Sequence, residues 1–148
     1  MVCNYLKNKK ILFVLGVFIF CSWNSFAKMR VPYTVSGEFT LDENPSVYEM
    51  CGINVFFQND ADVEVEEFTI VFFLFDSDGE PVSTGKNNIS IRVEEKVFPK
   101  ESYNCCLSLD DYMYLEPAED FYVDYMYVSK ILYSDGSVWD DPFGMQLF

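Results

Sequence analysis

Apolar and polar residues alternate in several stretches of the chain after residue 28. Between Tyr33 and Leu41 every second residue faces the same way, and most of that set is apolar. The same alternation recurs from Asn88 to Glu94 and from Ser102 to Leu109. A period of two is that of a strand with one face in a core, whereas a helix has a period of 3.6. No segment after residue 28 sustains the helical period, so the pattern predicts an all-β chain.

Seven strands are expected, separated by residues that favour turns. They are 33–41, 51–58, 67–75, 88–94, 102–109, 121–133 and a strand that begins at 138. The third is a nearly continuous apolar run, as in a central strand covered on both faces. This number and spacing predict an immunoglobulin-like antiparallel β-sandwich of about seven strands. The tail from Pro142 is expected to form an edge strand or a loosely held end.

Residues 1–27 have the three parts of a secretory signal peptide. Three lysines up to Lys10 precede an apolar run from Ile11 to Phe20, and Ser25 and Ala27 fit a cleavage site before Lys28. The apolar run has ten residues, and a spanning helix needs about 20, which disfavours the alternative of an uncleaved anchor. The bulky Phe20 before Cys21 also argues against a lipid anchor. We therefore expect a secreted or periplasmic protein with one domain, 28–148, and no integral membrane span after cleavage.

Charge and composition limit the function. Three of the ten basic residues and none of the 24 acidic residues lie in 1–27, so the rest of the chain carries a net charge of −17. Such a charge repels nucleic acid and anionic membranes. The chain has no histidine, which removes the commonest general base, the usual serine and cysteine catalytic pairs, and histidine metal sites. We expect no cofactor.

The centre of the chain resembles a known module. Phe72-Phe73-Leu74-Phe75-Asp76 matches the Phe-x-Leu-Tyr/Phe-Asp signature of FxLYD domains, which are immunoglobulin-like modules of exported prokaryotic proteins. Asn59 and the Asp78-Gly79 turn agree with that pattern. The segment 97–102 resembles its Leu-x-Pro-Gly-Glu-Ser approach to the next strand, with Lys100 in place of glycine. The resemblance covers roughly 51–109 and implies a β-sandwich with a structural or binding role; it brings no catalytic residue.

Three cysteines remain after residue 27. Cys51 and Cys105 share inward parity on the second and fifth strands, which neighbour each other in this sandwich, so a Cys51–Cys105 disulfide is a candidate in an oxidising compartment. Cys106 would then be a free thiol or link two chains. The alternatives are a vicinal Cys105–Cys106 bond and three reduced cysteines.

Acidic residues are abundant, but none forms a defined site. Asp76 to Glu80 looks like part of a calcium loop, yet Leu74 and Gly85 occupy the first and twelfth positions, where an EF-hand needs Asp and Glu. The acidic pairs Asp110-Asp111, Glu119-Asp120 and Asp140-Asp141 leave open weak calcium binding at one end of the sandwich, or simply solvated turn acids. No metal ligands and no catalytic pair are assigned.

Aromatic residues gather on the last hairpin. They are Tyr122, Tyr125, Tyr127, Tyr133 and Trp139. Such rings either pack in the core or form an interaction surface for a protein or carbohydrate partner. The shared parity of Tyr125, Tyr127 and Tyr133 with Ile131 favours the core for those three. The sequence thus suggests a non-enzymatic binding or protein-interaction module of the cell envelope or exterior; the alternatives are a small carboxylate-dependent secreted hydrolase and an accessory subunit of an envelope assembly.

Overall fold

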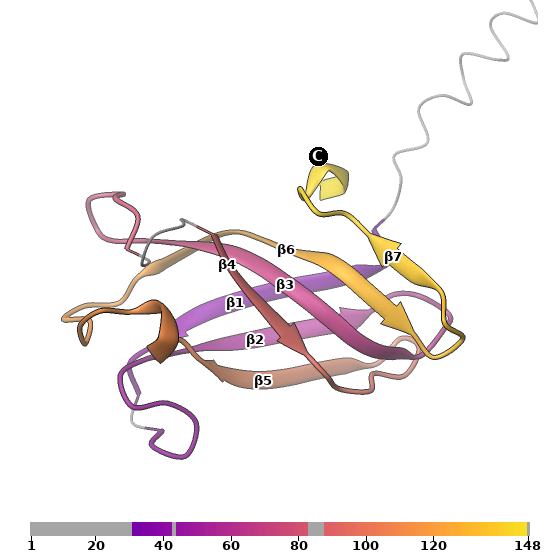
Figure 1. The fold of residues 1–148 in the computed structure, drawn as a ribbon, viewed down its shortest axis with the longest axis horizontal. Coiled ribbons are helices and arrows are strands. Elements are labelled where there is room, and N and C mark those ends of the chain that lie inside the picture. The colour runs from indigo at the N-terminus through magenta and orange to yellow at the C-terminus, as the bar shows by residue number, and fades with distance from the viewer. Residues whose placement is uncertain (1–30, 43, 83–87, 148) are drawn as a thin grey trace, which may run out of the picture. The chain divides into compact units, whose positions relative to one another are not determined.

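The computed structural model describes residues 31–42, 44–82 and 88–147. The predicted signal peptide, including Cys21, lies outside the described residues. Residues from Val31 onward form one compact unit, shown in Figure 1.

Seven strands make up this unit. They are β1 (Tyr33–Thr40), β2 (Gly52–Asn59), β3 (Val65–Phe75), β4 (Asn88–Val93), β5 (Ser102–Ser108), β6 (Tyr122–Tyr133) and β7 (Val138–Asp140). They form two antiparallel sheets with the strand orders β1-β2-β5 and β4-β3-β6-β7. The prediction of an all-β antiparallel sandwich is confirmed. Two short 3₁₀ helices, η2 (Asp110–Tyr112) and η3 (Met145–Leu147), lie outside the sheets.

The core lies between the sheets and follows from the alternation in the sequence. Ile53, Val55 and Phe57 of β2 are buried, and so are Phe68 and Ile70 of β3. The rings of Phe57 and Phe68 stack across the sandwich, with centroids 4.0 Å apart and planes at 10°. Such a pair contributes about 0.5–1.5 kcal/mol beyond its buried area. Because one ring comes from each sheet, this contact helps to hold the two sheets together.

The loops gather at the two ends of the sandwich. The connections 41–51, 76–82 and 109–121 lie at one end, on the left in Figure 1, and 60–64, 94–101 and 134–137 lie at the other. We call these the acidic end and the opposite end. Every charged residue in the described part of the three acidic-end connections is an Asp or a Glu. The described basic residues, Arg92, Lys96, Lys100 and Lys130, lie on strands or in an opposite-end loop.

The C-terminal segment is neither an edge strand nor a loose end, so that expectation was wrong. After β7 the chain makes a turn at Pro142 and Phe143 and ends in η3. The carboxylate of Asp141, which is 5% exposed, accepts the N–H groups of Met145 (3.0 Å) and Gln146 (2.9 Å). A buried carboxylate with two backbone donors holds this turn in place.

Candidate functional site

The outer face of β3 is apolar in its second half, from Val71 onward, where an outer face is usually polar. Phe68, Ile70 and Phe72 point into the core, so the alternate residues point away from it. Val71 and Phe73 are among those outward residues, and neither belongs to the core cluster. This explains the continuous apolar run in the sequence: one parity fills the core and the other makes an apolar surface.

Strand β6 adds aromatic rings to this surface because it contains bulges. Its register against β3 shifts between Val71 and Phe73, opposite the segment from Asp124 to Tyr127. Within the shift, Tyr125 adopts a φ of +49° and its N–H donates to Asp124 Oδ1 (2.8 Å). A bulge re-aims the side chains of its strand. The Tyr125 ring consequently meets the Phe73 ring edge to face, with centroids 5.9 Å apart.

One half of this outer face is covered by the C-terminal turn. Tyr127, opposite Val71, is only 8% exposed although it is not part of the core cluster. Its hydroxyl donates to the carbonyl of Pro142 (3.2 Å). Gly144 passes so close that an added Cβ would lie 3.0 Å from the ring, at a φ of +64°. Only glycine combines that conformation with that closeness at no cost. Burial, and then the charge of Asp141, raise the pKa of Tyr127.

The other half of the face is bare. Tyr122 is 65% exposed and Tyr125 is 58% exposed, and both lie beside half-buried Phe residues of β3. We call this set the aromatic strip: Phe73, Phe75, Tyr122 and Tyr125. Tyr122 pairs with Phe75 across the strands, so the strip runs along β3 and β6 toward the acidic end.

A hollow of about 520 Å³ opens beside the strip. Its walls include Phe75, Tyr122 and the carboxylate residues Asp76 and Asp124. Asp76 Oδ1 accepts the N–H groups of Asp78 (3.0 Å) and Glu80 (2.8 Å), which fixes the loop after β3. The hollow therefore combines aromatic rings with carboxylates whose positions are set by hydrogen bonds.

A larger hollow, about 720 Å³, lies on the three-stranded sheet. Its walls carry small and polar side chains such as Ser36, Asn54 and Asn104, with one half-buried ring, Phe56. It has no strongly exposed aromatic residue among its lining. Size alone does not make it the better candidate, because binding sites combine apolar anchors with a few polar groups.

The five aromatic residues singled out in the sequence separate into three environments. Tyr122 and Tyr125 are exposed, Tyr127 and Tyr133 are buried, and Trp139 is half-buried with its ring 5.2 Å from that of Tyr33. Core packing was expected for Tyr125, Tyr127 and Tyr133, but only Tyr133 belongs to the core cluster. The bulges break simple parity. Phe73 and Phe75 were missed as surface residues, although the two-parity apolar run of β3 signals an apolar outer face.

The three cysteines in the described residues are free thiols, and the Cys51–Cys105 disulfide was a wrong prediction. The strands β2 and β5 are neighbours as expected, but Cys105 lies opposite Val55, four residues from Cys51 along β2. Four residues span roughly 13 Å in a strand, whereas a disulfide needs Cα atoms within about 7 Å. The two cysteines do share a face of the sheet, as predicted, but the register of β5 against β2 keeps them apart.

The thiols of Cys51, which is buried, and Cys105, which is half-buried, are poor nucleophiles. Burial, with a smaller contribution from Asp110, raises the pKa of Cys51 to about 11. Burial and the adjacent Cys106 raise the pKa of Cys105 to about 11 despite a hydrogen bond with Tyr103. Only the thiolate reacts or binds metal readily, so these cysteines serve as core and sheet residues.

Acidic residues hold backbone rather than a metal ion. Asp110 accepts the N–H groups of Glu49 (2.7 Å), Met50 (2.9 Å) and Cys51 (3.2 Å). Partial burial raises the pKa of Asp110, but these hydrogen bonds outweigh it and the pKa is lowered overall. In the described part of the chain, no group of three or more His, Cys, Asp or Glu residues could hold a metal ion. Of the acidic pairs suggested as a weak calcium site, Asp140-Asp141 lies at the edge strand β7, where Asp140 is in register with Lys130 of β6.

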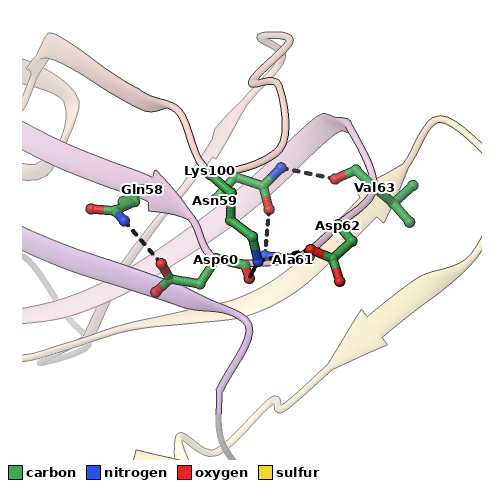
Figure 2. A network of polar contacts seen from close by, with 7 residues as sticks. All are labelled: Gln58, Asn59, Asp60, Ala61, Asp62, Val63 and Lys100. Atoms are coloured by element: carbon green, nitrogen blue, oxygen red, sulfur yellow. Dashed lines mark hydrogen bonds and ion pairs between the residues drawn. The ribbon is translucent and has the colours of Figure 1, made fainter.

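A buried amide organises the opposite end of the sandwich, as Figure 2 shows. Asn59 is fully buried; its Nδ2 donates to the carbonyls of Val63 (2.8 Å) and Val97 (3.0 Å), and its Oδ1 accepts the Ala61 N–H (3.0 Å). Lys100 donates its N–H to the Asn59 carbonyl (2.9 Å) and its ammonium pairs with Asp62 (2.9 Å). The side-chain amide of Asn59 is used entirely within the fold, so this network is structural.

Lys100 has a φ of +65°, a conformation that favours glycine. Glycine is the residue expected at this position from the resemblance to FxLYD modules. The backbone conformation explains why glycine suits the site, while the family relationship itself stays a prediction.

The described residues include no helix long and apolar enough to cross a membrane.

Comparisons with known proteins indicate the fold only. No family model matches the sequence, and no curated protein matches it. A solved structure of a hypothetical protein from Peptoclostridium difficile 630 is similar, with a TM-score of 0.56 and 13% sequence identity, over 76% of this chain and 87% of that one. At that identity the likeness concerns the arrangement of strands, and the chain is similar to that protein in fold.

Proposed function

We propose that this chain is an exported, non-enzymatic β-sandwich that binds a partner molecule through the bare half of its four-stranded sheet. The observation that carries the proposal is the pair of exposed rings, Tyr122 at 65% and Tyr125 at 58%, on an apolar outer face. Tyrosine is enriched at interaction hot spots because its ring buries a large area and loses little side-chain entropy. The signal peptide predicted in residues 1–27 supports a binding event at the cell envelope or exterior.

The use of the carboxylates supports a non-enzymatic role. A glycosidase-like hydrolase needs two acids that face each other across a cleft. Asp76, Asp110 and Asp141 instead accept backbone N–H groups and hold loops. Each of these three carboxylates thus has a structural role in holding a loop.

Site-specific photo-cross-linking in the native host tests the proposal. A benzophenone amino acid is introduced at position 122 or 125, and as a matched control at Ser36, which is exposed on the outer face of the three-stranded sheet. We expect a discrete cross-linked adduct from positions 122 and 125 and none from position 36. Equal labelling from all three positions, or no adduct from any, would show that the strip is not a binding surface.

A further inference from the structure

The aromatic strip is an unpartnered sheet face with a defined neighbourhood. Tyr122 and Tyr125 are mostly exposed, and the C-terminal turn that covers Tyr127 rests on a different part of the face. The same sheet thus shows how the chain covers an apolar outer surface when it does so itself. At the strip, the described chain supplies no such cover.

The backbone at Tyr125 is arranged at a cost to folding. Its φ of +49° lies in the left-handed region, which is unfavourable for a residue with a Cβ and is visited mainly by Gly, Asn and Asp. Such conformations collect at functional sites, where another requirement outweighs the strain. Here the strained residue is an exposed ring aimed at Phe73. Gly, Asn or Asp would adopt this backbone conformation with less strain. The presence of tyrosine therefore indicates a role for the aromatic ring.

Charge indicates the occupant. Asp76 and Asp124 line the hollow beside Tyr122, and the loop after Phe75 adds Asp78 and Glu80. The described acidic-end connections carry no basic residue. Aromatic faces are themselves electron-rich and attract cations. The rings and the carboxylates therefore favour the same partner, a positively charged one.

We propose that the aromatic strip and its hollow bind a segment of a partner protein rich in lysine and arginine; this rests on the proposed function. Arginine stacks its planar group on an aromatic face while it pairs with a carboxylate, which matches rings beside Asp76 and Asp124. A neutral sugar would use the rings but gain nothing from the carboxylates. Anionic glycans, nucleic acids and anionic membranes would be repelled.

Binding of synthetic peptides to the full-length protein tests this. Two 12-residue peptides share the same apolar residues; one carries lysine and arginine at the remaining positions and the other carries glutamate. We expect calorimetry to detect only the basic peptide, with an affinity that falls roughly tenfold between low and high salt as screening shortens the range of the charges. Failure of the basic peptide to bind, or equal binding of the acidic one, would overturn the inference.

Charge-only variants sharpen the test. Asp76→Asn keeps an Oδ1 acceptor for the N–H groups of its loop, and Asp124→Asn keeps one for the N–H of Tyr125 within β6, so both variants remove charge and leave the geometry. The double variant is expected to weaken the basic peptide about fivefold or more. Glu38→Gln, an exposed carboxylate on the three-stranded sheet, is the matched control and should leave the affinity unchanged.

The two proposals fail in different ways. If positions 122 and 125 cross-link to a partner whose contact segment is not basic, or bind a neutral glycan with no effect of salt or of the charge variants, then the binding face stands and its cationic specificity is wrong. If no focused adduct forms, the proposed function itself fails.

Discussion

The two outer faces of this sandwich meet the same solvent but have opposite character. On the three-stranded sheet the outward residues are mainly small or polar, for example Ser36, Asn54 and Asn104. On the four-stranded sheet they include Val71, Phe73 and a row of tyrosines. An antiparallel sheet needs only one buried face, so the polar face is the ordinary solution. The apolar face is the more informative one. The C-terminal turn covers one half of it, and the exposed half needs a different explanation.

The covered half should be the more costly one to alter. Tyr127→Ala removes a ring that is buried beneath the C-terminal turn, and we expect a loss of about 3 kcal/mol in the free energy of unfolding. Phe56→Ala, a half-buried ring on the polar outer face, should cost about 1 kcal/mol. Urea unfolding at pH 7 measures both. Equal losses would mean that the turn does not bury Tyr127.

The turn itself should depend on Asp141. Asp141→Ala leaves the N–H groups of Met145 and Gln146 without their acceptor, and we expect a loss of about 2 kcal/mol. Hydrogen exchange at these two amides should accelerate, because they open to water. Asp140→Ala, next to it but exposed, is the control and should change stability by less than about 0.5 kcal/mol. Unchanged exchange in Asp141→Ala would contradict this account of the turn.

The loop before β2, beside the polar sheet, is held by a carboxylate and should respond to acid. The pKa of Asp110 is lowered in the folded state, so its contribution is complete above its unfolded pKa, near 4, and is lost as the pH falls through the folded pKa. Asp110→Asn removes the charge, and we expect it to cost about 1 kcal/mol at pH 7 and almost nothing once the pH is well below the folded pKa of Asp110. Urea unfolding across this pH range measures the difference. Asp111→Asn, at an exposed neighbour, should run parallel to the wild type; a constant gap for Asp110→Asn at all pH values would refute the linkage.

The smallest expected effect lies in the bare half. Asn tolerates the left-handed backbone at position 125, so relief of strain should offset the lost contact with Phe73 and leave Tyr125→Asn within about 0.5 kcal/mol of the wild type. Tyr122 has ordinary strand geometry, where Asn is disfavoured. The same substitution there should cost about 1 kcal/mol. A larger loss at 125 than at 122 in thermal unfolding would show that the ring of Tyr125 serves the fold.

Much of the fold was predictable because strands reveal themselves locally. The alternation from Tyr33 onward depends on neighbouring residues and one buried face, and it gave β1, β2, β4 and β5 to within a residue or two. The strand β6 was found, but the directions of its side chains were not, since a bulge leaves no mark in a pattern of period two. Parity therefore assigned Tyr125 to the core, although it is exposed.

Features that depend on register between distant segments could not be predicted. Cys51 and Cys105 lie on neighbouring strands with the same parity, but their separation is set by how β2 and β5 align. The C-terminal turn depends on Asp141 reaching its own backbone and on Gly144 resting on Tyr127. The periodicity of the sequence predicts neither the separation of the two cysteines nor the contacts of the C-terminal turn. Tyr122 and Tyr125, half of the candidate site, were singled out because aromatic residues gather on the last hairpin, but parity assigned Tyr125 to the core and its exposure was not foreseen.

The left-handed backbone at Tyr125 has a consequence for mutation and selection. Glycine and asparagine reach this conformation more easily than tyrosine does, so drift that acts only through folding would tend to replace the ring. A tyrosine or another large aromatic residue retained at this position in diverged descendants would record selection for contact with a partner. Conversely, a laboratory selection for thermal tolerance alone should accept asparagine and tyrosine about equally at position 125, so the residue found there indicates which pressure is acting on the chain.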